Sequence, residues 1–449
     1  MQKAIAPGLQ HTHLRWGILA VIFAASCLSY GDRISLALAG PGMARDVSLG
    51  VVKIGYLFSA FSWAYVLGQV PAGGLLDRFG PRGVYGASIA IFSLLAVLVG
   101  FSGLLSAGAA FAAILALRFL SGLAQSPIFP GNGRVVAAWF PTAERGRASA
   151  IFNASQYFAL VVFAPLLGWI SHVAGWKSCF WFIGLFGFVL ALLWTRNVYD
   201  PRRHPRISAS EIETIEGGGG LVLAAGRAPG AAAALTWRAV KALLRHRMLA
   251  GIYLGQYCVN TLTWFFLTWF PIYLSRARGL SVLKAGFAAA LPAVCGGIGG
   301  VLGGVISDRL LRAGYSLSFA RKAPIVAGML LSVVMIGCIF ARSQTVMLLL
   351  MSLSFFGKGI GSLGWTLIAD TSPTGMVGVN GALFNLIGNI SGVTTPVIIA
   401  YLVKTTGSFN DALLFVGATA LLAIAGYVPI AGTIRRLELK PAPIAEGAL

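Results

Sequence analysis

Long apolar stretches alternate with short polar connections from residue 14 to residue 432. Each stretch is long enough to cross about 30 Å of hydrocarbon as a helix. A backbone surrounded by lipid must satisfy its own hydrogen bonds, so uninterrupted stretches of this length predict helices rather than strands. The pattern therefore predicts an all-α membrane protein. About twelve transmembrane helices are expected, at residues 14–39, 52–75, 84–104, 107–129, 147–172, 176–197, 247–274, 284–306, 323–341, 344–368, 379–404 and 409–432.

The composition agrees with this fold class. Of the 449 residues, 57% are hydrophobic and only 10% are charged, which is far from the balance of a soluble domain. If the N-terminus is cytoplasmic, most of the Lys and Arg residues behind the net charge of +21 lie in cytoplasmic connections, as the positive-inside rule requires. We therefore expect a multi-pass protein with both termini in the cytoplasm. A nucleic-acid partner is not expected, because the basic residues are scattered over several short loops.

The chain divides near its middle. Residues 198–246 form its longest polar connection, and we interpret them as a cytoplasmic linker between two six-helix halves, residues 1–197 and 247–449. Within the linker, Ser210 stands before two glutamates and resembles the N-cap of a short helix. The sequence GGLLDRFGPR after the second span is echoed by GGVISDRLLR after the eighth. Such repeats are typical of transporters built from two pseudo-symmetric halves.

Charged residues inside the predicted spans are the first candidates for function. Asp32 and Arg33 are neighbours in the first span, and Arg118 lies in the fourth. A charge near mid-bilayer costs about 3 to 10 kcal/mol, and such residues usually face a wet cavity where ions or substrates pass. One carboxylate cannot neutralise two arginines, so the surplus positive charge predicts a site for an anion. The alternative is a buried ion pair that only locks helices together.

Several motifs resemble those of one transporter family. GGLLDRFGPR resembles the loop between helices two and three of the major facilitator superfamily. SYGDR at 29–33, LRFLSGLAQSPIFPGN at 117–132 and FFGKGIGSLGW at 355–365 resemble its anion:cation symporter family. Within that family the chain is most similar to bacterial permeases for D-galactonate and for D-glucarate and galactarate. The resemblance implies a monomer with the major facilitator fold in the bacterial inner (plasma) membrane. It also implies import of a sugar-acid anion, a hexonate or hexarate, by proton symport with alternating access.

The resemblance also implies roles for single residues. Asp32 matches a protonation site that works together with Arg118. Arg33 matches a substrate contact, and its guanidinium suits a carboxylate because it forms two parallel charge-assisted hydrogen bonds. The hydroxyl groups and C–H faces of a sugar acid suit amide and aromatic side chains. Candidates at matching positions are Tyr30, Tyr65, Gln156, Trp365 and Asn385.

Two intramembrane positions leave alternatives open. The resemblance implies an acid seven residues after Arg118, but this chain has Gln125 there, which hydrogen-bonds and cannot titrate. Three interpretations follow: proton coupling through Asp32 alone, an uncoupled facilitator or exchanger of organic anions, or a form held in one conformation. Lys358, in the tenth span, either adds to the positive field around the anion or snorkels toward an interface. A transporter-like membrane sensor is a more distant alternative.

The repeated Asp–Arg pairs predict a gate. An acidic residue at the mouth of a helix bundle accepts hydrogen bonds from a neighbouring helix N-terminus, and arginines there can bridge the two halves. Asp77 with Arg78, and Asp308 with Arg309, are therefore expected to hold the cytoplasmic side shut in the outward-open state.

Chemistry other than transport is not expected. The predicted spans contain neither a nucleophile–base pair nor a metal-binding cluster, so we expect no enzyme, no metal and no cofactor, with the proton gradient as the energy source. The expected partners are a small organic anion, protons and the lipid bilayer. Gly296, Gly300 and Gly304 stand four apart and predict one close helix–helix contact.

Overall fold

The computed structural model describes residues 12–47, 49–220, 222, 237–373 and 376–438. Regular structure in these residues is helical throughout, with no strand among them. The prediction of an all-α fold is confirmed.

In the first half of the chain, helices cover all six of the predicted spans. Its helices are α1 (Leu14–Asp46), α2 (Val51–Phe101), α3 (Ala107–Gln125), α4 (Ile128–Trp139), α5 (Thr142–Ala174) and α6 (Trp176–Asn197). Helix α2 covers the second and third predicted spans, which are joined by a kink at Gly80, where a φ of 74° suits a residue without a Cβ. Helices α3 and α4 continue one another across Ser126 and Pro127, so this span reaches beyond the predicted end at residue 129.

The second half contains shorter helical segments joined end to end. They are α10 (Arg247–Trp264), the π-helix η3 (Phe265–Trp269), α11 (Phe270–Arg276), α12 (Val282–Arg312), α13 (Leu317–Val333), the 3₁₀-helix η4 (Val334–Ile339), α14 (Gln344–Ile360), α15 (Gly364–Thr371), α16 (Val377–Thr406), α17 (Asn410–Ala425) and the π-helix η5 (Gly426–Ile430). Between the halves lie a 3₁₀ turn at Pro201–Arg203, α7 (Ala209–Gly217) and α9 (Trp237–Arg245).

Eleven spans in the described part of the chain are long and apolar enough to cross a membrane. The remaining predicted span, at residues 247–274, corresponds to α10, η3 and α11, in which a π-helical segment at Phe265–Trp269 interrupts the α-helix. Such π segments occur frequently at functional sites, and this one begins directly after Trp264.

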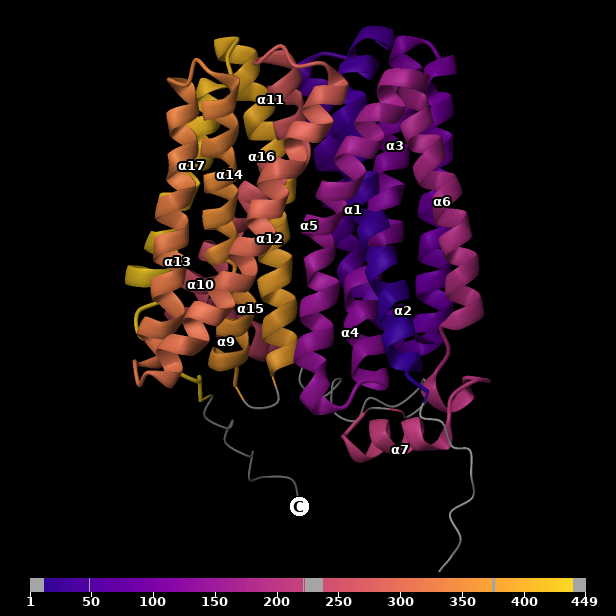
Figure 1. Cartoon of the computed structure of the whole chain (residues 1–449), viewed down its shortest axis with the longest axis vertical. Helices are drawn as coiled ribbons and strands as arrows, with labels where there is room; N and C mark the ends of the chain where they lie inside the picture. Colours follow the sequence, from indigo (N-terminus) through magenta and orange to yellow (C-terminus); the bar gives the residue numbers. More distant parts are fainter. Residues whose placement is uncertain (1–11, 48, 221, 223–236, 374–375, 439–449) are drawn as a thin grey trace, which may run out of the picture.

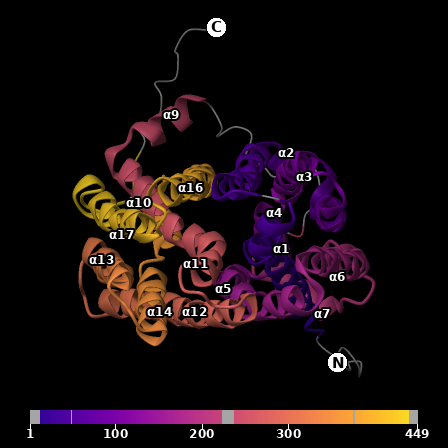
Figure 2. The ribbon, with the colours of Figure 1, turned by 90° about the horizontal axis from the view of Figure 1, so that it is seen from above.

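The helices stand side by side along the long axis of the molecule (Figure 1). Seen from above, α1–α6 and α10–α17 form two neighbouring groups (Figure 2). Helix α7 lies at one end of the bundle, which we call the linker end; α1, α5 and α13 begin there. We call the opposite end, where α1 finishes at Asp46 and α12 begins at Val282, the far end.

Contacts between the two halves are concentrated toward the far end. The hydroxyl groups of Tyr56 and Tyr401 are hydrogen-bonded at 2.7 Å. The backbones of Gly168 and Gly286 are in contact, which leaves no room for a Cβ. Tyr157 makes the contacts between the halves that lie nearest to the linker end. Among the described residues, the other hydrogen bonds, ring contacts and close glycine contacts between the halves lie between Tyr157 and the far end. The halves therefore diverge toward the linker end.

Candidate substrate and proton site

A buried polar network surrounds Asp32, whose side chain is inaccessible to solvent. Arg118 donates from Nη2 to Asp32 Oδ1 at 2.7 Å and from Nη1 to the Asp32 main-chain carbonyl at 3.2 Å. Gln125 Nε2 donates to Asp32 Oδ2 at 2.7 Å, and Ser121 Oγ donates to the same oxygen at 3.4 Å. Residues 118, 121 and 125 share one face of α3 because they are spaced by three and four. Both carboxylate oxygens therefore have donors from a single helix.

The amide of Gln125 links this network to the neighbouring arginine. Its Oε1 accepts a hydrogen bond from Ser29 Oγ at 2.6 Å, while its Nε2 donates to Asp32. Ser29 in turn accepts from Arg33 Nη2 at 3.5 Å. A carboxylate at position 125 would face Asp32 at hydrogen-bond distance, and one of the two groups would have to hold a proton. With glutamine the contact forms without that proton.

Arg33 has a different environment from Asp32, its neighbour in sequence. Its guanidinium is almost buried, its Nε lacks a hydrogen-bond partner, and no described carboxylate lies within ion-pair distance of it. The guanidinium carbon lies 4.8 to 5.9 Å from the centres of four aromatic rings, those of Tyr30, Phe61, Tyr65 and Trp264. Three rings belong to the first half and Trp264 belongs to the second. Arg33 is thus a cation at the junction of the halves, held by rings and available to an anion.

A small cavity adjoins both buried arginines. Its accessible volume is about 10 Å³, roughly the room of one water molecule, and its lining comes from α1, α2, α3, α10 and η3. Besides Arg33 and Arg118 the lining residues are Leu36, Leu57, Phe58, Phe61, Trp264 and Thr268. Because the lining belongs to both halves, a molecule bound there contacts both of them.

Lys358 is a further buried cation. Its side chain is almost inaccessible, and its ammonium donates to Tyr157 Oη at 3.1 Å across the boundary between α14 and α5. The ammonium also lies 5.0 and 5.3 Å from the ring centres of Tyr157 and Phe355. Snorkelling would bring the charge to an interface with water, so this burial favours the other interpretation, a contribution to the internal positive field.

Glycines allow α14 to approach α12 closely enough to bury Lys358. The backbone of Gly299 touches the carbonyl of Phe356, and that of Gly303 touches the carbonyl of Ile360. The predicted face of Gly296, Gly300 and Gly304 is therefore only partly right: Gly296 is packed against Phe355 and Tyr157, but Gly304 has no neighbour within 4 Å of the place where a Cβ would stand. The glycines of α12 that lie closest to α14, Gly296, Gly299 and Gly303, are therefore spaced by three and four residues rather than by four alone.

The predicted hydroxyl-binding residues separate into two groups. Tyr30 and Tyr65 lie against Arg33, as described above. Gln156 is half-buried on α5, Trp365 is 51% exposed on α15 with its ring 5.1 Å from that of Phe384, and Asn385 accepts a hydrogen bond from Asn389 at 3.0 Å. None of these three is among the contacts that the structure gives Arg33. Their role in substrate binding stays a prediction.

Sequence comparison identifies the family. A model of the Major Facilitator Superfamily matches residues 22–396. The chain belongs to the Major Facilitator Superfamily. The probable galactarate/D-glucarate transporter of Bacillus subtilis is 51% identical over 437 residues, covering 97% of this chain and 96% of the relative. The D-galactonate transporter of Escherichia coli is 37% identical over 427 residues, covering 94% and 97%. The predicted resemblance to these permeases is confirmed.

Solved structures confirm the major facilitator fold. A D-xylose–proton symporter superposes with a TM-score of 0.69 at 15% identity, covering 94% of this chain and 99% of its own. A bacterial homologue of the human lysosomal transporter Spinster superposes with a TM-score of 0.72 at 16% identity, covering 94% and 98%. With its eleven apolar spans, this superfamily member is a multi-pass membrane protein.

The predicted gate residues lie at the linker end of this major facilitator protein. Asp308 Oδ1 accepts from Arg321 at 3.2 Å, and Arg321 also binds Asp370 at 2.8 Å, so Asp308 is paired within its own half. Arg78 is exposed and lies over the ring of Phe79, and Arg309 is exposed. The side chain of Asp77 is outside the described part of the structure. The gating role of Asp77, Arg78, Asp308 and Arg309 stays a prediction.

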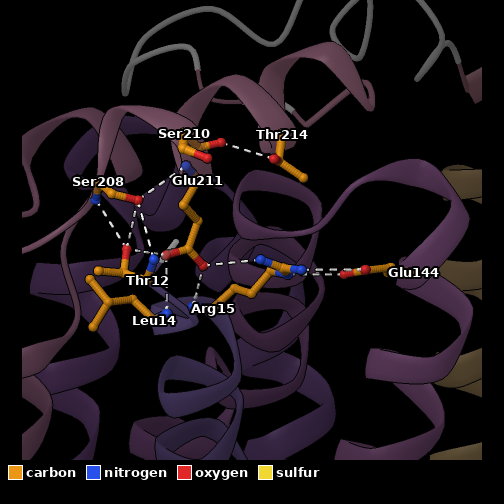
Figure 3. Close-up of polar contacts among 8 residues, drawn as sticks. All are labelled: Thr12, Leu14, Arg15, Glu144, Ser208, Ser210, Glu211 and Thr214. Carbon is orange, nitrogen blue, oxygen red and sulfur yellow. Dashed lines mark hydrogen bonds and ion pairs between the residues drawn. The ribbon is translucent and has the colours of Figure 1, made fainter. Parts of the chain in front are cut away.

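A second polar cluster docks α7 onto the first half (Figure 3). Glu211 is fully buried, and its carboxylate accepts hydrogen bonds from the main-chain nitrogens of Leu14 and Arg15, at 3.1 and 3.2 Å, and from Thr12 Oγ1 at 2.6 Å. Arg15 also forms ion pairs with Glu211, at 3.2 Å, and with Glu144 at the start of α5, at 3.0 Å. The Glu211 carboxylate thereby caps the first turn of α1, whose amides have no partner within the helix.

The predicted N-cap of α7 was placed two residues too late. The helix begins at Ala209, and Ser208 Oγ accepts from the main-chain nitrogen of Glu211 at 3.2 Å, whereas Ser210 lies inside the helix. Both serines precede a glutamate by three residues, as in a capping box. In the structure Ser208 is the N-cap, and the glutamate three residues after it, Glu211, contacts α1. On the same helix, the hydrogen bond from Arg202 lowers the pKa of the partly exposed Glu216.

Sequence reasoning missed four residues that contact Asp32 or Arg33. Ser29 precedes Arg33 by four residues and Ser121 follows Arg118 by three, so helical spacing alone was a signal that they share a face with the charges. Phe61 likewise precedes Tyr65 by four. Trp264 carried no such signal, because its contact with Arg33 joins the two halves of the chain.

Proposed function

We propose that this protein imports a sugar-acid anion across the bacterial inner membrane by proton symport with alternating access. The substrate is a hexarate such as D-glucarate or galactarate, or a hexonate such as D-galactonate. The observation that carries the proposal is the separation of two buried arginines: Arg118 is paired with Asp32, whereas Arg33 faces rings and a cavity and has the neutral hydroxyl of Ser29 as its long, 3.5 Å hydrogen-bond partner. The names of the relatives, which are transporters of these acids, support it.

Substrate binding follows from the free guanidinium. As the cavity widens to admit the substrate, a carboxylate accepts two hydrogen bonds from Arg33, and the surrounding rings cover the C–H groups of the substrate. Trp264 belongs to the second half and lies 5.9 Å from the Arg33 guanidinium. A substrate held between Arg33 and Trp264 therefore connects the two halves, which is the condition for substrate occupancy to influence their relative movement.

Proton coupling is assigned to Asp32. When Asp32 takes a proton, its Coulomb attraction to Arg118 is lost, and Arg118 becomes available to the bound anion beside it in the same cavity. Gln125 stabilises the charged form of Asp32 through a 2.7 Å hydrogen bond but cannot carry a proton itself. The proposed cycle consequently uses one titratable carboxylate at this site.

The linker end is assigned to the cytoplasm. The basic connections lie on that side in the arrangement that the positive-inside rule favours, with both termini cytoplasmic. Because the halves contact each other toward the far end and diverge toward the linker end, we interpret this conformation as open to the cytoplasm. The proposed unit is a monomer, since each half supplies residues to the same cavity within one chain.

An uncoupled facilitator or exchanger of organic anions is the second candidate, and Gln125 is the observation that favours it. Uptake of labelled galactarate and D-galactonate into proteoliposomes, with and without an inward proton gradient, distinguishes the two. Accumulation above equilibrium that requires the gradient supports symport. Equilibration that is indifferent to the gradient supports the uncoupled carrier, and absence of uptake of both acids contradicts the substrate assignment.

A further inference from the structure

We propose that Lys358 binds a second carboxylate and thereby makes the site select hexarates, which are dianions, over hexonates, which are monoanions. The inference rests on the proposed function and deepens it, because it names the charge class of the substrate.

Burial of Lys358 without a counter-ion is the first observation. An ammonium group in the membrane interior is costly unless it is paired or performs a function. The Lys358 side chain is 3% exposed, its hydrogen-bond partner is the neutral hydroxyl of Tyr157, and no described carboxylate lies within ion-pair distance of its Nζ. The hydrogen bond satisfies one of three donors and leaves the positive charge without compensation.

The charge balance of the membrane interior is the second observation. The described residues there include three cations, Arg33, Arg118 and Lys358, and the single buried carboxylate of Asp32. One cation is neutralised by Asp32, so two positive charges remain. Because Gln125 stands where an acid was expected, no second carboxylate reduces this surplus. A dianion neutralises it completely, whereas a monoanion leaves one buried cation unpaired.

The position of the two unpaired cations is the third observation. Arg33 lies on α1 in the first half and Lys358 on α14 in the second. Tyr30 lies against Arg33, and Tyr157, also in the first half, accepts the hydrogen bond of Lys358. Each cation is therefore in contact with a tyrosine of the first half, and Lys358 makes this contact across the boundary between the halves. A hexarate carries a carboxylate at each end of its six-carbon chain and is suited to bind one cation of each half.

A purely structural lysine is the alternative to exclude. In that case the Lys358–Tyr157 hydrogen bond only fastens α14 to α5, and its removal weakens the protein without changing substrate preference. Galactarate and D-galactonate form a matched ligand pair for this question, because they differ only in the carboxylate or hydroxymethyl group at one end. Their ratio of Kd values reports on the second carboxylate alone.

The experiment measures Kd for both acids by isothermal titration calorimetry, on the full chain in lipid nanodiscs at fixed pH and salt. For the unaltered protein we expect galactarate to bind at least about tenfold more tightly than D-galactonate. Lys358→Gln is expected to bring this ratio close to one mainly by weakening galactarate, and Lys358→Arg is expected to keep it. Lys404→Gln, at an exposed lysine on α16, is the matched control and should leave the ratio unchanged.

Each outcome has a defined meaning. A ratio near one in the unaltered protein overturns the inference without any variant, so the test does not depend on the folding of Lys358→Gln. An equal loss for both acids in Lys358→Gln, or no change, also overturns it. If the unaltered protein binds neither acid, the proposed function itself fails, and that result is distinct from binding of both acids without preference.

Discussion

Arg118 binds Asp32 twice, through its carboxylate at 2.7 Å and through its main-chain carbonyl at 3.2 Å. The second contact does not depend on the charge of Asp32. Protonation of the carboxylate therefore weakens the attachment of α3 to α1 without removing it, and Arg118 keeps a fixed position from which one of its nitrogens can turn to a substrate. This arrangement suits a switch that must reverse in every transport cycle.

Asp32→Asn should abolish proton-driven accumulation while preserving exchange of substrate for substrate. Asparagine has nearly the size of aspartate and still accepts a hydrogen bond from Arg118, but it cannot take up a proton. We expect gradient-driven uptake of galactarate into proteoliposomes to fall at least about tenfold, with counterflow within about threefold of the unaltered protein. Ser121→Ala removes the 3.4 Å donor to Asp32 and a 3.3 Å acceptor for Gln125 but no titratable group; it is the control and should accumulate substrate normally. Accumulation by Asp32→Asn would place the proton site elsewhere.

Gln125→Glu should increase the number of protons moved with each substrate by about one. The new carboxylate would stand at the 2.7 Å contact now made by the amide, where two charged carboxylates repel each other strongly and one must hold a proton. Reversal-potential measurements in proteoliposomes, with opposed substrate and proton gradients, give the stoichiometry directly. An unchanged stoichiometry would show that position 125 does not take part in coupling. Gln125→Asn is the uncharged control, and we expect it to keep the original stoichiometry.

Arg33→Lys should weaken binding of both sugar acids by about 10- to 100-fold, because an ammonium group cannot form the two parallel hydrogen bonds of a guanidinium. Unlike a change at Lys358, this loss is expected to affect galactarate and D-galactonate alike, since both carry the carboxylate that we propose Arg33 binds. Calorimetric Kd values test it, with Arg147→Lys, at an exposed arginine over Trp16, as the control. Retention of affinity would move the first carboxylate to another cation.

The fold was predictable because membrane burial imposes a strong pattern. Uninterrupted apolar length fixes the number of spans, and the repeated Asp–Arg motif indicates the two halves. The ends of the helices were less predictable: α1 continues to Asp46, seven residues beyond its predicted end. The residues beyond position 39 are mostly small or polar, so apolar length does not predict that they are helical. They extend the helix because the backbone hydrogen bonds continue into the membrane interface.

The members of the buried network that forms the candidate site were predictable where charge carried the information; their roles stay predictions. Asp32, Arg33 and Arg118 were identified because charges are rare in apolar spans, and helical spacing was sufficient to add Ser29 and Ser121. The partner of each arginine was not predictable. Asp32 pairs with Arg118 rather than with Arg33 because of the position of α3 against α1. The contact of Trp264 with Arg33 depends on the packing of one half against the other. Such contacts between distant segments leave no local trace in sequence.

Glu211→Gln should destabilise the protein measurably, and Glu216→Gln should not, although both residues lie on α7. The Glu211 carboxylate is fully buried and accepts hydrogen bonds from Arg15, from Thr12 and from two main-chain nitrogens. Loss of its charge removes charge-assisted hydrogen bonds and leaves Arg15 with Glu144 alone, at an expected cost of about 2 kcal/mol. Glu216 pairs with Arg202 on the exposed side, where solvent screens the interaction. Thermal unfolding in detergent, monitored by cysteine accessibility, should show a lower Tm for Glu211→Gln and an unchanged Tm for Glu216→Gln. Equal shifts of Tm in both variants would mean that the buried cluster does not anchor α7 to the first half.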